Sequence, residues 1–131
     1  QWRGGFGSVR EFVYLNDGGA SIEGEGHKFP PWGFRGGNDG GSAGLRLDRT
    51  NGKGGELPSK VPHTPVDAGD RFVCVGPAGG GYGDPLLRDP EMVLADVTDE
   101  LITIARAADD YGVIINEDLS IDRAATEKRR A

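Results

Sequence analysis

The chain divides into two kinds of sequence at residues 76–85, which read Gly76-Pro77-Ala78-Gly79-Gly80-Gly81-Tyr82-Gly83-Asp84-Pro85. It has 131 residues and 23 glycines, and all but one of these glycines lie at or before Gly83. Glycine disfavours helix, and its ordinary usage is about 7% of residues. The sequence therefore excludes a uniform helical bundle.

Short apolar segments separated by turns precede this stretch. Residues 8–15 and 20–25 favour two strands, and the Asn-Asp-Gly-Gly sequence between them predicts that they pair as a hairpin. A second hairpin is expected at residues 43–49, because an Asn-Gly turn follows, and further short strands at 57–60 and 71–75. Frequent turns between short strands indicate an antiparallel sandwich or barrel.

Residues 29–44 are expected to form a long irregular loop instead. Pro30 and Pro31 lack the N–H that a ladder needs, and the glycines that follow carry no side chain to pack. Loops of this length are often functional.

Helical signals follow Gly83. Asp89-Pro90-Glu91 combines a capping side chain with a proline at the first helical position. The apolar spacing beyond it fits one helix to Asp110, but Thr98 or Thr103 could also cap a second, shorter helix. Gly112 is expected to end this region.

The end of the chain predicts a strand at residues 113–115 and a final helix over 123–130 capped by Asp122. We therefore expect an α+β fold, with a Gly-rich antiparallel β region at 1–83 and a helical segment at 84–131, together forming one domain. Few large apolar side chains imply a thin core.

Charge and cysteine content narrow the functional classes. The formal net charge of −6 argues against binding to a nucleic-acid backbone, which needs a basic face. Cys74 is the single cysteine, so no internal disulfide can form, and its apolar neighbours indicate a buried strand. We expect a cytoplasmic protein, because no apolar run is long enough to span a membrane and no signal peptide is recognisable.

Known catalytic patterns are absent from the sequence. Residues 76–85 lie between a predicted strand and a predicted helix, as phosphate-binding loops do, but lack both the Walker and the Gly-x-Gly-x-x-Gly patterns. His27 and His63 belong to no spaced set of metal ligands. We expect no catalytic residue, metal ligand or bound cofactor on this chain.

The loops are the candidate functional regions. We expect them to face a substrate or a partner, although Asp39 could also stabilise a turn and the aromatic side chains more often serve in subunit contacts. The candidate residues are Trp32, Asp39, Gly79, Gly80, Gly81, Tyr82 and Asp84.

Four stretches resemble the carboxy-terminal part of the hydantoinase B family, which includes components of N-methylhydantoinases, 5-oxoprolinases, and acetone and acetophenone carboxylases. These stretches are residues 4–11, 30–40, 79–91 and 111–114. The family pattern has a glycine between two short helices near Glu100, and its absence leaves the one-helix interpretation open.

The resemblance implies a component of a large ATP-dependent complex that opens a cyclic amide. A hydantoinase A-like partner would phosphorylate the substrate's oxygen, and the amino-terminal part of the B-like subunit would carry the divalent metal, Zn or Mn, with ATP and Mg elsewhere in the complex. The isolated chain is not expected to be active. The alternatives are a biotin-independent, ATP-dependent ketone carboxylase or a non-catalytic assembly module of either complex.

Overall fold

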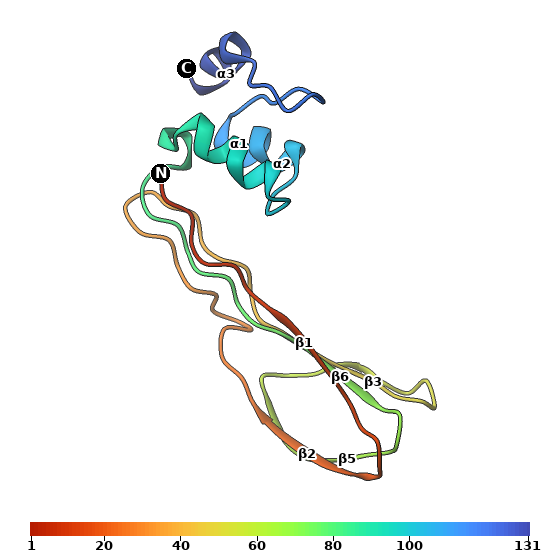
Figure 1. The fold of residues 1–131 in the computed structure, drawn as a ribbon. Coiled ribbons are helices and arrows are strands. Elements are labelled where there is room, and N and C mark those ends of the chain that lie inside the picture. Colours follow the sequence, from red (N-terminus) through yellow and green to blue (C-terminus); the bar gives the residue numbers. More distant parts are fainter. The chain divides into compact units, whose positions relative to one another are not determined.

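The computed structural model describes residues 1–131 and contains two antiparallel sheets followed by helices (Figure 1). The strands are β1 (Val9–Val13), β2 (Gly18–Glu23), β3 (Gly44–Asp48), β4 (Gly55–Glu56), β5 (Lys60–Val66) and β6 (Arg71–Val75). The helical elements are η1 (Pro85–Leu87), α1 (Pro90–Thr98), α2 (Ile104–Tyr111) and α3 (Arg123–Arg130). The predicted α+β fold is confirmed. None of the helices has the length and apolar character that crossing a membrane requires.

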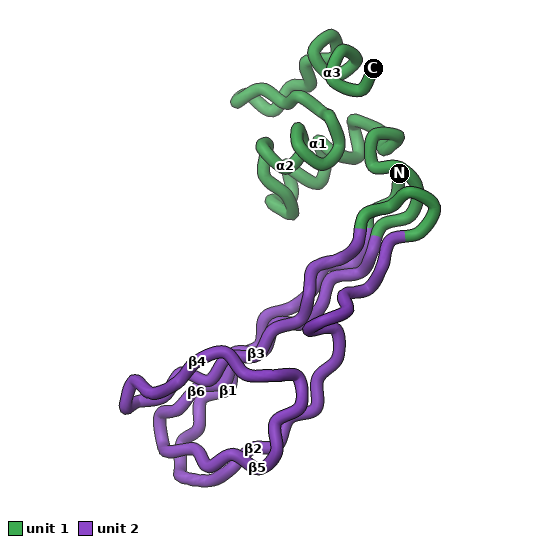
Figure 2. Tube along the Cα trace, turned by 180° about the vertical axis from the view of Figure 1, so that it is seen from behind, with its two compact units in different colours: residues 1–3, 34–38, 81–131 green, residues 4–33, 39–80 purple.

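The chain forms two compact units, which Figure 2 distinguishes by colour. The sheet unit contains residues 4–33 and 39–80, and the helical unit contains residues 1–3, 34–38 and 81–131. The predicted organisation into residues 1–83 and 84–131 within one domain is not tested by this division and stays a prediction.

Two sheets share one core in the sheet unit. The larger sheet has the order β1-β6-β3-β4, and the smaller sheet pairs β2 with β5. Neither sheet closes into a barrel. Buried side chains from both sheets meet between them, namely Leu45, Leu47, Val61, Val66 and Phe72.

The hairpin predicted for residues 8–25 is wrong. β1 pairs with β6 and β2 pairs with β5, so the two consecutive strands lie in different sheets. The Asp17 carboxylate, in the segment between them, accepts a 2.9 Å hydrogen bond from the Ala68 N–H and so contacts the turn before β6. The ring of Tyr14 also packs edge-on against Phe72 of β6, with 6.1 Å between centroids.

The second hairpin is confirmed as β3 and β4, with Gly52 at φ 73° in its turn. The strand expected at residues 57–60 is displaced. The Leu57 N–H still bonds the Leu45 carbonyl, but Pro58 has no N–H to continue the pairing, and β5 begins at Lys60. β6 spans its predicted residues, although Cys74 within it is only half-buried.

Residues 67–70 form the turn before β6, which contains the fully buried carboxylate of Asp70. This carboxylate accepts hydrogen bonds from the backbone N–H groups of Thr50 (2.9 Å) and Asp67 (3.1 Å). These bonds, together with the Arg49 guanidinium at 3.2 Å, hold the pKa of Asp70 below its ordinary value.

Glycine-rich extended segments of the sheet unit run side by side outside the strands (Figure 2). We call these segments, which contain Gly5, Pro31, Gly40, Gly41, Ala78 and Gly79, the glycine passes. Backbone hydrogen bonds join them, from Gly79 N–H to the Gly5 carbonyl (2.9 Å), from Ala78 N–H to Gly41 and from Gly40 N–H to Pro31. A Cβ atom added to Gly40 would lie 1.9 Å from the Ala78 carbonyl oxygen. The predicted irregular loop is therefore a packed structure in which backbone lies directly on backbone.

The helical unit has a side-chain core. Val93, Val97, Ala107, Val113 and Ile115 are buried together. The predicted caps are confirmed: the side chains of Asp89 and Asp122 accept from backbone N–H groups at the starts of α1 and α3.

Two short helices replace the single helix that the spacing also allowed. α1 ends at Thr98, and Thr103 caps α2 by accepting a hydrogen bond from Arg106 N–H. Glu100, between them, has φ 57°, the left-handed conformation that favours glycine. Gly112 ends α2 at φ 63° as expected. Residues 113–115 form no strand, because only Ile115 makes a bridge, to Ile121.

Candidate functional site

The predicted site residues divide between the two units. Trp32, Asp39, Gly79 and Gly80 lie in the sheet unit, whereas Gly81, Tyr82 and Asp84 lie in the helical unit.

In the sheet unit, the glycine passes fix the backbone that carries Trp32. A Cβ atom on Gly80 would lie 2.1 Å from the Trp32 carbonyl oxygen, so only glycine allows this approach. The Asp39 carboxylate accepts a 2.8 Å hydrogen bond from Gly33 N–H, which joins the two ends of residues 33–39. The Trp32 side chain itself is 79% exposed. This region therefore presents an exposed indole on backbone held by direct contacts.

In the helical unit, Tyr82 is the centre of a small aromatic cluster. Its backbone exchanges hydrogen bonds of 2.9 and 2.8 Å with Trp2, and its ring lies 5.8 Å from that of Phe34. The Arg35 guanidinium lies 6.0 Å from both ring centroids, within range of a cation–π interaction. All three aromatic side chains remain about half exposed. Exposed aromatic rings beside an arginine are typical of binding surfaces.

The other two predicted residues of this unit have backbone roles. Gly81 donates a 2.9 Å hydrogen bond to the Asn38 carbonyl. The Asp84 carboxylate accepts a 2.8 Å bond from Leu86 N–H and so caps η1.

Sequence reasoning missed a buried charged pair in the helical unit. The guanidinium of Arg88 lies 2.9 Å from the Asp96 carboxylate, and both side chains are more than 90% buried. Arg3 also bonds Asp96, at 3.1 Å, and Arg88 lies 5.9 Å over the Tyr111 ring. Burial raises the pKa of the Tyr111 phenol. The sequence feature that could have indicated this pair is that Arg88 lies within residues 79–91, one of the stretches that resemble the family.

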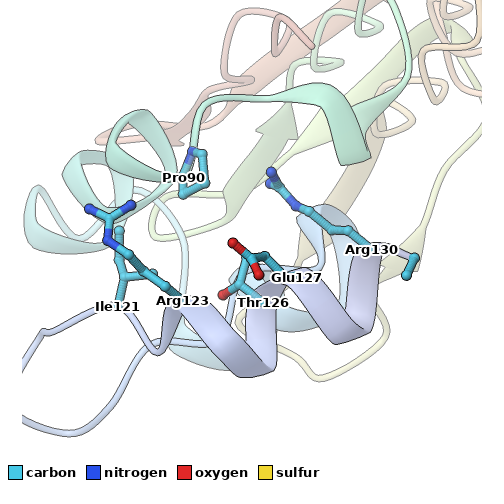
Figure 3. Close-up of a pocket in the computed structure, with 7 residues that line it drawn as sticks. Pro90, Ile121, Arg123, Thr126, Glu127 and Arg130 are labelled. Atoms are coloured by element: carbon cyan, nitrogen blue, oxygen red, sulfur yellow. The ribbon is translucent and has the colours of Figure 1, made fainter.

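A surface pocket of about 380 Å³ lies between the start of α1 and helix α3 (Figure 3). Two of its polar side chains already have structural partners. Arg130 donates to the Tyr111 and Arg88 carbonyls, and the Thr126 hydroxyl accepts from Ile114 N–H. These bonds hold α3 in place and indicate that Arg130 and Thr126 have a structural role. The lining residues are Pro90, Ile121, Arg123, Thr126, Glu127, Arg130 and Ala131.

Metal ligands do not gather anywhere in the structure. No three side chains of His, Cys, Asp or Glu lie close enough together to hold a metal ion. A metal ion needs three or four converging ligands. The residues of this chain therefore do not fit the divalent metal that the family implies.

The comparisons with known proteins identify the family. The sequence model of the Hydantoinase B/oxoprolinase family matches residues 1–85, and the chain belongs to this family. It is 47% identical over 132 residues to the B component of a putative D-/L-hydantoinase of Pseudomonas sp. (strain NS671), covering 99% of the chain and 22% of that relative. It is 35% identical over 140 residues to the beta component of the caprolactamase of Pseudomonas jessenii, covering 100% of the chain and 23% of that relative.

Solved structures agree with this assignment. The ATP-dependent caprolactamase from Pseudomonas jessenii matches with a TM-score of 0.78 at 32% identity, over 95% of this chain and 22% of the other. A nucleotide-free acetone carboxylase matches with a TM-score of 0.64 at 18% identity, over 92% and 24% of the two chains, and shows the shared fold alone. The chain spans less than a quarter of the length of each of these proteins.

Proposed function

We propose that this chain is part of the B-type subunit of an ATP-dependent enzyme that opens cyclic amides by hydrolysis. The support is its identity to the B component of a hydantoinase and to the beta component of a caprolactamase. Hydantoin and caprolactam are both rings that contain an amide bond. A cyclic amide is therefore the substrate class that these two relatives share.

The chemistry explains why such an enzyme uses ATP. Resonance makes an amide carbonyl a poor electrophile, and phosphorylation of its oxygen makes the carbon open to attack by water. In this proposal a hydantoinase A-like subunit carries out the phosphorylation with ATP and Mg. The proposal assigns the divalent metal, Zn or Mn, to the rest of the complex, and the lack of a converging ligand set in this chain supports that assignment. A cytoplasmic location, where ATP is available, is part of the proposal.

The contribution of this chain in the proposal is two rigidly held aromatic sites, one in each unit, and each faces the substrate or a neighbouring subunit. Trp32 is exposed while its carbonyl lies against Gly80, so its indole projects from fixed backbone. Tyr82 is held in the same way by its hydrogen bonds to Trp2. Side chains on fixed backbone lose less conformational entropy when they bind.

Two other functions are ranked below this one. The acetone carboxylase has 18% identity to this chain, so ketone carboxylation has weaker support than ring hydrolysis. A non-catalytic assembly module would bind its partner without contributing to the reaction. It predicts that the isolated 131 residues bind the partner tightly but bind neither nucleotide nor substrate, and activity of the isolated chain would exclude it.

A turnover assay on the purified complex that contains this chain tests the proposed reaction. Hydantoins, 5-oxoproline and caprolactam are supplied separately with ATP and Mg, and the ring-opened product and phosphate are measured. We expect at least one ring to open only when ATP is present. Carboxylation of acetone or acetophenone with bicarbonate, without hydrolysis of any ring, would contradict the proposal.

A matched pair of variants in the same complex tests the role of the exposed surface. Trp32→Ala removes an indole that is 79% exposed, and Phe29→Ala removes a ring that is 78% exposed. We expect the first substitution to reduce turnover or complex formation and the second to have a smaller effect, with unfolding midpoints unchanged in both. Equal effects would mean that Trp32 has no special place at the site.

A further inference from the structure

The four sheet edges of the sheet unit differ in how well they resist pairing with another strand. Natural proteins protect such edges by short strands, bulges or prolines. β4 has two residues, β2 has a register shift between Ala20 and Ile22, and β5 contains Pro62 and Pro65. β1 carries the charged residues Arg10 and Glu11, but it has neither a bulge nor a proline: its five residues pair with β6 in unbroken register, and all five are exposed. β1 is the open edge of the sheet unit.

The hydrogen bonds at the two ends of β1 show which backbone groups are available. Gly76 N–H donates to the Ser8 carbonyl, and Tyr14 N–H donates to the Asp70 carbonyl. Antiparallel pairing alternates, so the even-numbered residues of β1 face β6. The N–H and C=O groups of Val9, Glu11 and Val13 therefore point away from β6, along the open edge.

An apolar groove lies beside this edge. It has a volume of about 550 Å³. Its lining is mostly apolar, with Phe12, Tyr14, Phe72, Cys74, Ala20 and Ile22, and also includes Gly19, Ser21 and Glu23 of β2. Phe12 remains 53% exposed at its rim, although its ring is large and apolar. An exposed apolar groove beside open backbone groups is the arrangement that binds an added β-strand.

We propose that β1 and this groove bind an extended apolar segment from the part of the same B-type subunit that this chain does not span. The segment would pair with Val9, Glu11 and Val13 and place alternate side chains against Phe12 and Ile22. More than three quarters of each compared relative lies outside the matched part, so a large polypeptide of the same subunit is available. The proposal rests on the proposed function, in that this chain is taken to be part of a B-type subunit, and it is independent of the substrate.

Site-specific cross-linking in the complete complex tests this occupant. The photoreactive residue benzoylphenylalanine replaces Phe12, and mass spectrometry identifies the cross-linked peptide. Phe29→benzoylphenylalanine is the control, because Phe29 is exposed but does not line the groove. We expect position 12, and not position 29, to give a peptide of the B-type subunit from outside residues 1–131. A cross-link to a second copy of residues 1–131, a cross-link to the A-like subunit, or no cross-link would overturn the proposal.

Hydrogen exchange of the unmodified complex provides a measurement that needs no variant. The N–H groups of Arg10 and Phe12 face β6 and serve as internal references. If a strand is added, the N–H groups of Val9, Glu11 and Val13 exchange within about tenfold of these references. Exchange at the open edge that is much more than tenfold faster would overturn the proposal.

Discussion

The glycine passes of the sheet unit and the core of the helical unit are held together in opposite ways. In the passes, backbone lies directly on backbone, and a Cβ on Gly4 would lie 2.0 Å from the Gly79 carbonyl oxygen. In the helical unit, side chains such as Val93 and Val113 fill the interior and have no exposed surface. We therefore expect an added atom to destabilise the glycine passes and the removal of atoms to destabilise the helical core.

This difference also changes the interpretation of the glycine content. A glycine-rich sequence with few large side chains is often disordered, because it cannot bury enough apolar surface. Here the glycines allow close contacts between passes, and backbone hydrogen bonds such as Gly79 N–H to Gly5 satisfy the polar groups. The region is ordered without a side-chain core.

The largest effect is expected from adding one methyl group to a glycine pass. Gly40→Ala places a Cβ 1.9 Å from the Ala78 carbonyl oxygen, and overpacking of this kind costs about 3 kcal/mol or more. Gly41→Ala is the control next to it, because its Cβ would meet only the Ala78 Cβ at 3.8 Å. Chemical denaturation of both variants measures the difference. Equal stability would show that the passes are not closely packed.

Removing atoms from the helical core is expected to have the next largest effect. Val113→Ala deletes two methyl groups from a side chain with no exposed surface and should reduce the free energy of unfolding by about 2 kcal/mol. The control is Leu87→Ala, at a side chain that is 69% exposed, with an expected loss below about 0.5 kcal/mol. If Val113→Ala were as mild as the control, the helical core would not support this unit.

Asp70 extends the comparison to a buried side chain that is stabilised by backbone N–H groups. Its pKa is lowered in the folded chain, chiefly by its bonds to Thr50 and Asp67, so its ionised form stabilises the fold. Because the folded pKa lies below the unfolded value of about 3.9, this stabilisation is present above about pH 4. It is lost as the pH falls through the folded pKa.

Unfolding measured between about pH 2 and 7 tests this dependence. Asp70→Asn should be less stable at neutral pH, and its stability should fall less steeply in acid than that of the unchanged chain. Asp118→Asn is the control: hydrogen bonds from Ser120 also lower the pKa of the Asp118 carboxyl, but this residue is exposed. A pH profile unchanged by Asp70→Asn would contradict the assignment.

Local signals predicted part of this structure well. The helix caps at Asp89 and Asp122, the end of α2 at Gly112 and the limits of β6 depend on neighbouring residues, and the sequence contains that information. The partner of β1 was not predictable in this way. It depends on contacts between residues far apart in the chain, such as the hydrogen bond of Asp17 with Ala68, 51 residues away.

The contacts of the candidate site were likewise not predictable from local sequence signals. The sequence marked Trp32, Gly80 and Tyr82 as candidate loop residues. Only the folded chain shows that Gly80 packs against the Trp32 backbone and that hydrogen bonds to Trp2 hold the backbone of Tyr82. The Arg88–Asp96 pair was missed because it depends on how α1 packs after η1. Both cases depend on tertiary contacts, which local sequence patterns do not specify.

The smallest effect is expected from introducing a glycine at Glu100. Glu100 has φ 57° between α1 and α2, which strains a residue with a Cβ, and its side chain is exposed. Glu100→Gly should therefore raise the free energy of unfolding by about 0.5–1 kcal/mol, since relief of strain exceeds the entropy that glycine adds to the unfolded chain. Asp99→Gly is the matched control, because Asp99 has an ordinary φ of −81° and should lose stability. A gain in the free energy of unfolding for Glu100→Gly and a loss for Asp99→Gly would show that backbone conformation decides where this chain needs glycine. A loss of stability in both variants would mean that the Glu100 conformation carries no strain.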